Sequence, residues 1–181
     1  MAYYVKRHTD DKPYGFAKGH DSAMRRKDRE VTEIDDILRI VDSAKILHLS
    51  LFDGEYPYIV PLHYGYEYSG STLAFYMHGA KEGRKLDLIR NNPHVCIELE
   101  CGVELVSGGD NPCKYGSAYA SVIGRGIAEI VEDDQEKAKG LELLMKNQTG
   151  RTFGIDSRMA ASVAVLKVSL SEFTAKSRPK L

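Results

Sequence analysis

The chain has 181 residues, of which 43% are hydrophobic, and its 25 lysines and arginines nearly balance 26 aspartates and glutamates. A net charge near zero gives no general attraction to nucleic acid or to a membrane surface. No apolar run approaches the roughly 18 residues that cross a bilayer, and the first residues lack the apolar core of a signal peptide. We therefore expect a cytoplasmic protein that binds neither nucleic acid nor membrane, built as one domain with a sizeable core.

The three cysteines, Cys96, Cys101 and Cys113, cannot all pair within one chain, and a reducing compartment keeps them as thiols. The sequence contains no CxxC and no HxxxH spacing, so none of the familiar zinc patterns is present. We expect structural thiols and no metal site.

Residues 1–23 contain glycine, proline and scattered charges without periodicity, which indicates an N-terminal arm that is flexible or packs against a partner. The globular domain is expected over 24–181. Its first element is an amphipathic helix, because Ile34, Ile37, Leu38, Val41 and Ala44 recur at helical spacing. Thr32 is the expected N-cap of this helix.

A strand over 46–51 follows, and Asp53-Gly54 is a strong hairpin signal. The returning segment, 56–68, is long, aromatic and typical of a strand. Its prolines cannot donate to a ladder, so each belongs at an edge, a strand start or a bulge. A break at Pro61 leaves neighbouring backbone groups able to bond something other than a strand.

The next strand, 72–76, ends in His78-Gly79, and a basic helix begins after Gly83. A helix N-terminus offers unpaired N–H groups and a positive dipole end, which favour a bound anion. Gly79 and Gly83 remove side-chain bulk where a phosphate would approach the backbone, and Arg84 and Lys85 supply charge. The pattern also fits an ordinary helix with a solvated basic face.

The remaining pattern predicts a strand over 94–100, a loop over 102–116 and a strand over 119–131. Gly124-Arg125-Gly126 in the middle of this last strand indicates a bulge or a close approach of another segment. A helix from Asp133 to Gly150, a last strand over 163–168 and a basic tail over 176–181 complete the chain. About six strands, mostly joined by hairpins, with two or three peripheral helices predict a mainly β fold, a small antiparallel barrel.

Several common sites are poorly supported, since the chain has no GxSxG elbow, no GxGxxG and no GxxxxGK[ST]. The break at Pro61 beside an anion-binding turn instead suits a flat ring with a polar edge that is linked to a phosphate. Flavin mononucleotide (FMN) has this shape. Val60, Pro61 and Leu62 would present backbone groups to the ring, while Arg84 and Lys85 would hold the phosphate.

Four stretches in this order, 24–30, 53–62, 78–85 and 121–126, resemble the 5-nitroimidazole resistance proteins, which belong to the pyridoxamine 5'-phosphate oxidase-like flavin-binding split-barrel superfamily. The resemblance covers about residues 24–178. It implies an antiparallel split β-barrel that forms a homodimer, with a flavin at each end of the subunit interface. Pyridoxamine phosphate oxidase activity is not expected, because the C-terminal segment lacks the Arg and His pattern of true oxidases.

The resemblance also implies roles by position. It places Val60, Pro61 and Leu62 along the flavin ring. It places Gly83, Arg84 and Lys85 at the phosphate, and His78 near the ring. Ser121 and Arg125 are further cofactor-binding candidates, and Gly79 joins them through its place in the turn.

The function expected from these residues is an FMN-dependent oxidoreductase, with FAD as the alternative flavin, that reduces nitroaromatic compounds such as nitroimidazoles. Electrons would come from a reduced nicotinamide or another donor. His78 would orient the small-molecule substrate or donate a proton, because imidazole titrates near neutral pH. Two alternatives stay open: a haem-binding or haem-degrading split barrel with His78 or His63 on the iron, and a non-catalytic flavin-binding module.

Overall fold

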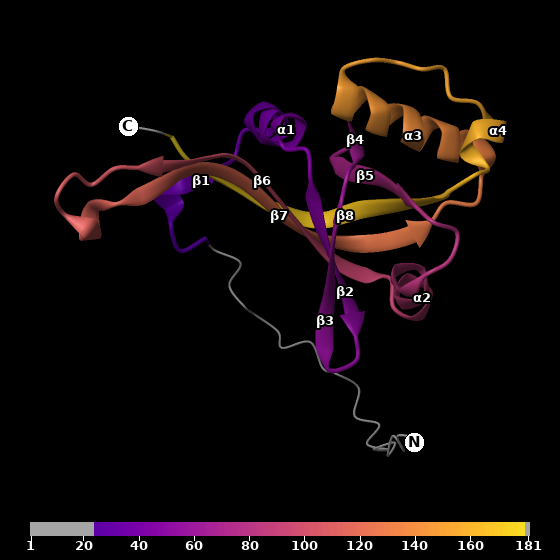
Figure 1. The fold of residues 1–181 in the computed structure, drawn as a ribbon, viewed down its shortest axis with the longest axis horizontal. Coiled ribbons are helices and arrows are strands. Elements are labelled where there is room, and N and C mark those ends of the chain that lie inside the picture. The colour runs from indigo at the N-terminus through magenta and orange to yellow at the C-terminus, as the bar shows by residue number, and fades with distance from the viewer. Residues whose placement is uncertain (1–23, 180–181) are drawn as a thin grey trace.

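The computed structural model describes residues 24–179, so the expected N-terminal arm lies outside the described residues. Figure 1 shows the order of the elements along the chain. The helices are α1 (Ile34–Ser43), α2 (Arg84–Asn91), α3 (Asp134–Thr149) and α4 (Ser157–Ala160), with short 3-10 turns at Lys27–Arg29 and Pro112–Lys114. The strands are β1 (Glu30–Val31), β2 (Leu47–Asp53), β3 (Tyr56–Leu62), β4 (Gly65–Ser69), β5 (Thr72–Gly79), β6 (His94–Val106), β7 (Gly116–Ile130) and β8 (Ala164–Arg178).

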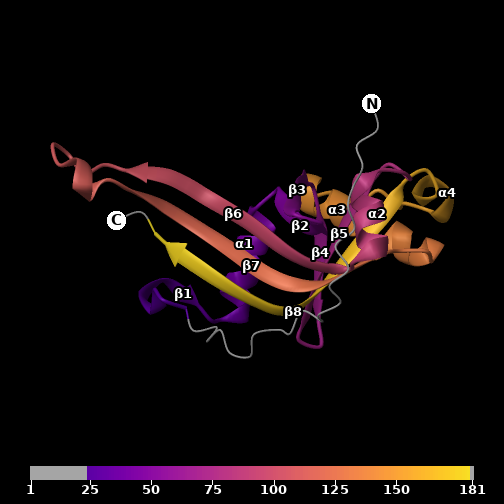
Figure 2. The same cartoon turned by 90° about the horizontal axis from the view of Figure 1, so that it is seen from below.

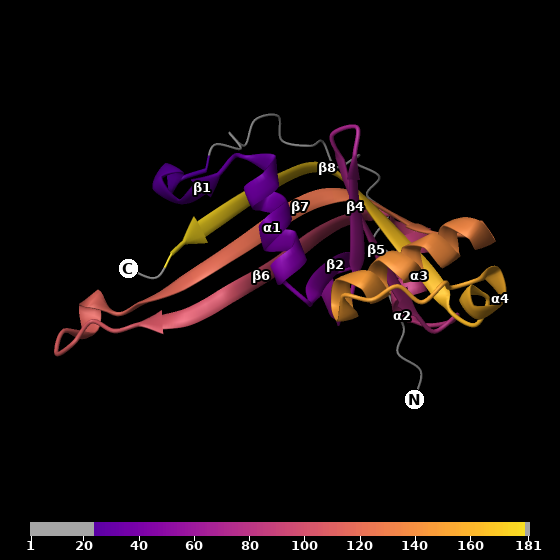
Figure 3. The ribbon, with the colours of Figure 1, turned by 90° about the horizontal axis from the view of Figure 1, so that it is seen from above.

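The strands form one antiparallel sheet in the order β3-β2-β6-β7-β8-β5-β4, with β1 added to β8. The helices lie at the periphery: α1 beside β6 and β7, and α3 against β4 and β5 (Figures 1 and 3). The predicted fold class, mainly β and antiparallel with peripheral helices, is confirmed. The described residues contain more strands than the six expected.

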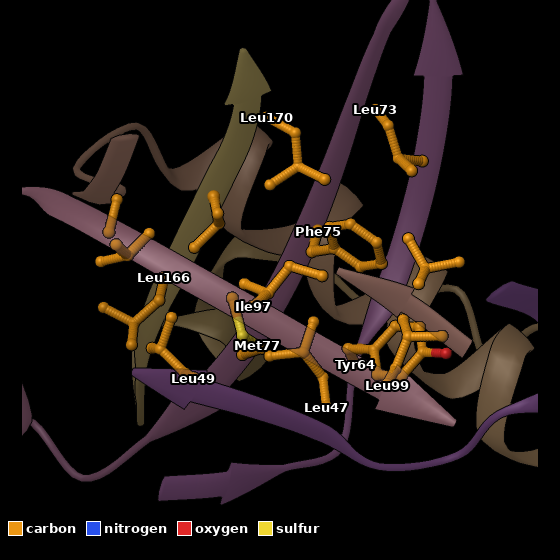
Figure 4. Close-up of a cluster of buried hydrophobic side chains, with 14 of the residues drawn as sticks. Leu47, Leu49, Tyr64, Leu73, Phe75, Met77, Ile97, Leu99, Leu166 and Leu170 are labelled. Atoms are coloured by element: carbon orange, nitrogen blue, oxygen red, sulfur yellow. The ribbon is translucent and has the colours of Figure 1, made fainter. Parts of the chain in front are cut away.

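The core lies inside the curved sheet, where alternate residues of the strands meet (Figure 4). Leu47 and Leu49 of β2 face Phe75 and Met77 of β5, and all four side chains are buried. Such burial of alternate positions follows from the two-residue period of a strand. The members labelled in Figure 4 are Leu47, Leu49, Tyr64, Leu73, Phe75, Met77, Ile97, Leu99, Leu166 and Leu170.

The hairpin predicted at Asp53-Gly54 joins β2 to β3, and Gly54 has the positive φ, 68°, that this turn requires. β3 is an edge strand, which explains its two prolines. Pro57 and Pro61 are four residues apart, so both point their missing N–H in the same direction, away from β2.

The long strand expected over 56–68 is interrupted at His63-Tyr64, and β4 begins at Gly65. The break expected at Pro61 is wrong, because Pro61 lies inside β3 and pairs with His48 in a continuous register. Tyr64 is fully buried, and its hydroxyl lies 2.6 Å from the Val41 carbonyl oxygen and 3.0 Å from that of Ala44. These carbonyls are at the end of α1, so the interruption between β3 and β4 anchors that helix.

The largest departure from the sequence expectation is a ribbon of β6 and β7 that projects beyond the barrel (Figures 1 and 2). The first five residues of the expected loop over 102–116 are strand, because β6 continues to Val106 past a bulge between Cys101 and Glu104. The expected bulge near Gly126 is confirmed as a register shift between β7 and β8. β8 also takes in the start of the expected basic tail, ending at Arg178.

Helix ends were predicted unevenly. The ends of α3 are confirmed, since Asp133 accepts a hydrogen bond from the Glu136 N–H and Gly150 is left-handed with φ 72°. The expected N-cap of α1 is wrong by one residue. Glu33 occupies that position instead of Thr32, without a capping bond from its side chain.

Candidate functional site

The end of β5 and the start of α2 form the turn that the sequence singled out. His78 and Gly79 are the last residues of β5, and they pair with Val165 and Ala164 of β8. Gly83 is the N-cap of α2 with φ 133°, a conformation that favours glycine, and no side chain caps the helix there. The first turn of α2 therefore has its positive dipole end open to a ligand.

Arg84 ties this turn to the β2–β3 hairpin. Its guanidinium forms an ion pair with Asp53 and lies 5.4 Å from the centre of the Tyr58 ring. The sequence assigned Asp53 only to a turn and Tyr58 only to strand packing, so both contacts were missed. A contact between residues 31 positions apart follows from the fold alone.

Lys85 lies directly over Gly79. A Cβ added to Gly79 would come 2.5 Å from the lysine Nζ, so a side chain at this position would displace the lysine. Among residues 24–179, no carboxylate lies within ion-pair distance of Lys85. A half-buried cation without a counter-charge is what an anion site requires.

His63 joins the same region, although the sequence offered it only as a haem ligand. The pairing of β4 with β5 ends at Gly65 and Tyr76, so His63 lies just outside this ladder, close enough for its charge to act on His78. The His63 Nδ1 lies 3.2 Å from the Lys45 carbonyl oxygen. Partial burial lowers the pKa of His78, and the charges of His63 and Lys85 lower it further. We call His63, His78, Arg84 and Lys85 the basic cluster.

The predicted ring-binding residues belong to the neighbouring edge strand, β3. Val60 and Leu62 are half-buried against the core, whereas Pro61 is exposed and faces His48 on β2. By strand alternation, the carbonyls of Pro61 and Ile59 point away from β2, where no other strand of residues 24–179 pairs with them. Near its start, Tyr58 contacts Arg84, and His63 directly follows the last residue of the strand.

Ser121 and Arg125 do not join the basic cluster within one chain. Both are on β7, two strands from β5, and Arg125 pairs with Glu172 of β8, seven residues along that strand from Val165, the partner of His78. Arg125 lies opposite Cys96 and forms a 3.3 Å ion pair with Glu172. Ser121 lies opposite Glu100 and Lys176.

Two cavities lie elsewhere in the protein. One of about 640 Å³ lies between α3 and the segment before α4, and one of about 490 Å³ lies between the C-terminal ends of α1 and α3. No residue of the basic cluster lines either cavity. In the part of the chain that the structure describes, no three His, Cys, Asp or Glu side chains are grouped to hold a metal, and no helix is long and apolar enough to span a membrane.

Comparison with known proteins identifies the family. A family model described as pyridoxamine 5'-phosphate oxidase matches residues 33–177. The chain belongs to this family. No curated protein matches it.

Several solved structures share the fold of this chain. A candidate 5-nitroimidazole antibiotic resistance protein from Bacteroides thetaiotaomicron is 30% identical, with a TM-score of 0.69 over 81% of this chain and 85% of that one. The flavocytochrome Anf3 from Azotobacter vinelandii is 20% identical, with a TM-score of 0.68 over 88% and 74%. An FAD and haem binding protein from Mycobacterium smegmatis is 15% identical, with a TM-score of 0.66 over 82% and 73%. The expected split-barrel family is confirmed.

Proposed function

We propose that this protein is an FMN-dependent oxidoreductase that reduces nitroaromatic compounds. The observation that carries the proposal is the basic cluster. Within the described part of the chain, an uncapped helix N-terminus, a lysine without a counter-charge and an imidazole meet beside an edge strand with unpaired carbonyls. Membership of the pyridoxamine 5'-phosphate oxidase family supports a flavin. The similarity to the candidate 5-nitroimidazole resistance protein supports a nitro substrate.

The residues present fit FMN. Lys85 and the first turn of α2 would hold the phosphate, with Gly79 and Gly83 leaving room for it. Arg84 would share its charge between the phosphate and Asp53. The carbonyl edge of β3 near Pro61 would accept hydrogen bonds from the N–H group of the flavin ring. The bound flavin would pass electrons from a reduced nicotinamide to the substrate, while His78 would orient the substrate or supply a proton.

The homodimer is also a proposal, and the outer face of β3, β2 and β7 is the surface we assign to it. Four large apolar side chains on this face are exposed: Phe52 by 61%, Ile59 by 58%, Ile123 by 48% and Ile127 by 43%. Arg125 lies on the same face, between the two isoleucines of β7. A second copy covering this face would bring Arg125 and Ser121 towards a neighbouring flavin. It would also bury an apolar area that water otherwise contacts.

Replacing Ile123 with Glu tests the dimer, because a buried carboxylate opposes association without changing the core. Light scattering should report a dimer for the wild type and a monomer for the variant. A monomeric wild type would contradict the proposed assembly.

The activity is tested by anaerobic oxidation of NADH or NADPH with a nitroimidazole as acceptor. We expect the flavin-loaded protein to turn over, and His78→Asn to retain flavin while its kcat falls by about 100-fold or more, the usual contribution of a positioned proton donor. Chromatography of the released cofactor distinguishes FMN from FAD. Tight flavin binding without turnover over a range of donors and acceptors would favour the non-catalytic module.

A further inference from the structure

The ribbon of β6 and β7 is the part of the fold that the proposed function leaves unused (Figure 2). β2 pairs with β6 only as far as Leu99, and β8 pairs with β7 only from Tyr119 onwards. Within residues 24–179, the edge of Glu100–Val106 that faces away from β7 therefore has no partner strand, and its regular part beyond the bulge is Glu104–Val106. A two-stranded ribbon is marginally stable in water by itself, and an open edge is a template for a further strand.

The ribbon also exposes large apolar side chains. Val103 is exposed by 57%, Leu105 by 71% and Tyr115 by 46%. Leu105 and Ser107 are two residues apart, so they point to the same side, and the Ser107 Oγ lies 3.5 Å from the Tyr115 hydroxyl. Leu105 and Tyr115 are therefore on one face of the ribbon, and we call them the ribbon patch. A patch of this kind beside an open edge is typical of a surface that another segment covers.

The charge of the ribbon is acidic. Between residues 100 and 116, Glu100, Glu104 and Asp110 outnumber the single basic residue, Lys114, and all four side chains are exposed. A segment that covers this surface should therefore carry apolar side chains next to basic ones. It should also adopt an extended conformation, because the open edge offers backbone groups at the spacing of a strand.

The chain itself contains such a segment near its N-terminus. Tyr3-Tyr4-Val5-Lys6-Arg7 places two aromatic residues and a β-branched one directly before two basic ones. Aromatic and β-branched side chains favour the extended backbone of a strand. The segment belongs to residues 1–23, which lie outside the described structure and before residue 33, where the family match begins. Membership of the family therefore assigns this segment no role.

The described chain begins where the ribbon leaves the barrel. β1 pairs with β8 close to its C-terminal end, and the Arg29 Nη1 lies 3.5 Å from the hydroxyl of Tyr119, the first residue of β7 that β8 covers. Residues 8–23 can span up to about 50 Å, whereas Glu100–Val106 is about 20 Å long. Residues 3–7 are therefore able to reach the ribbon of their own chain.

We propose that residues 3–7 bind the ribbon of the same chain as a short additional strand on the open edge of β6. By strand alternation, Tyr3 and Val5 share a face and pack on the ribbon patch, while the two basic residues lie near the acidic ones. The added strand satisfies backbone groups of the edge and removes the patch from water. The ribbon is then held in place by the N-terminal segment.

Hydrogen exchange of the full-length chain, read by mass spectrometry, tests the contact. Tyr3→Ser combined with Val5→Ser removes the apolar contact, so the amides of Glu100–Val106 should exchange about tenfold faster or more than in the wild type. Tyr14→Ser combined with Phe16→Ser is the matched control, because it removes two apolar side chains from the same segment outside residues 3–7. It should leave these amides unchanged. The amides of β5 should be unchanged in both variants, which shows that the barrel stays folded.

Carbodiimide cross-linking of a mixture of isotopically labelled and unlabelled chains identifies the chain that supplies the segment. Lys6 should link to acidic residues of the ribbon, Glu100, Glu104 or Asp110, within one chain. Links between labelled and unlabelled chains would overturn the assignment and show that the ribbon holds the segment of a second copy. Absence of Lys6 links, or unchanged exchange in the first variant, would overturn the proposal. Neither measurement needs flavin or turnover, so its outcome is independent of the proposed function.

Discussion

Two groups of charged side chains flank β5, and they differ in how their charges are matched. Tyr76 lies at the centre of one group, which α3 covers; its other members are Glu67, Glu136, Lys139 and Lys167, and we call it the Tyr76 cluster. Lys139 pairs with Glu67 at 2.6 Å, and Lys167 pairs with Glu136 at 2.6 Å. The other group, the basic cluster, lies two residues further along the same strand.

The difference separates a structural site from a candidate binding site. In the Tyr76 cluster every cation has a carboxylate, and both lysines also lie near the face of the buried Tyr76 ring, at 6.0 and 5.7 Å. In the basic cluster only Arg84 has a carboxylate, and Lys85 has none among the described residues. Matched charges stabilise the fold, whereas an unmatched cation beside an open helix end is available to a ligand.

Removing the charges of the basic cluster should have the largest effect. We expect Arg84→Ala combined with Lys85→Ala to weaken FMN binding by about 100-fold or more, because each charge-assisted contact contributes roughly 1.5–3 kcal/mol. Quenching of flavin fluorescence measures the affinity. Lys139→Ala is the control: it removes a cation of the Tyr76 cluster and should leave FMN affinity unchanged. Equal affinities for the double variant and the wild type would exclude the phosphate site.

A substitution in the Tyr76 cluster should lower the stability of the fold and leave FMN affinity unchanged. The Tyr76 hydroxyl lies 2.7 Å from Glu67 Oε1 and 3.2 Å from Glu136 Oε1, with the ring fully buried. Tyr76→Phe should lower the free energy of unfolding by about 1–3 kcal/mol, the cost of losing hydrogen bonds to charged groups. Urea denaturation measures this change. FMN affinity should stay the same, and a large loss of flavin would show that the two clusters are not independent.

Acid should weaken the Tyr76 cluster through Glu67. Burial alone would raise the pKa of this carboxyl, but hydrogen bonds from Lys139 and Tyr76 outweigh it and hold the pKa below its usual 4.5. A lowered pKa in the folded state contributes stability above pH 4.5 that is lost as pH falls through the folded value. Unfolding measured across this range should depend less on pH in Glu67→Gln. If the free energy of unfolding depends on pH equally in Glu67→Gln and in the wild type, groups other than Glu67 cause the acid sensitivity.

The smallest effect should come from Asp53, the carboxylate that contacts the basic cluster within residues 24–179. Asp53 pairs with Arg84 and, as an anion, opposes a phosphate at the same place. Asp53→Asn should therefore tighten FMN binding by up to about fivefold, in line with the roughly 0.2–1 kcal/mol of an exposed ion pair. A weaker affinity in this variant would instead mean that Asp53 orients Arg84 for the cofactor.

Local patterns predicted the elements of the site well. The hairpin at Asp53-Gly54, the turn at Gly83 and the edge position of Pro61 each depend on the backbone limits of glycine or proline, which a few neighbouring residues reveal. The two glycines around Arg125 likewise predicted the bulge near Gly126. The structure shows why a glycine stands there, since a side chain would meet the backbone of Ser169.

Contacts that depend on the closed sheet could not be predicted. The nearness of His63 to His78 requires the pairing of β4 with β5, and the Asp53–Arg84 pair requires that α2 lie beside the β2–β3 hairpin. The interruption at Tyr64 was missed because a buried tyrosine bonded to the end of α1 looks, in sequence, like any other strand tyrosine. The separation of Arg125 from the basic cluster is likewise a property of strand order.

The visible absorption spectrum of the purified protein tests the central claim most directly. It is recorded as isolated, and again after addition of excess FMN and removal of the unbound portion. The account predicts the two bands of an oxidised flavin, retained in proportion to protein. A colourless protein that retains no flavin would contradict the account, and a Soret band in place of the flavin bands would assign the site to haem.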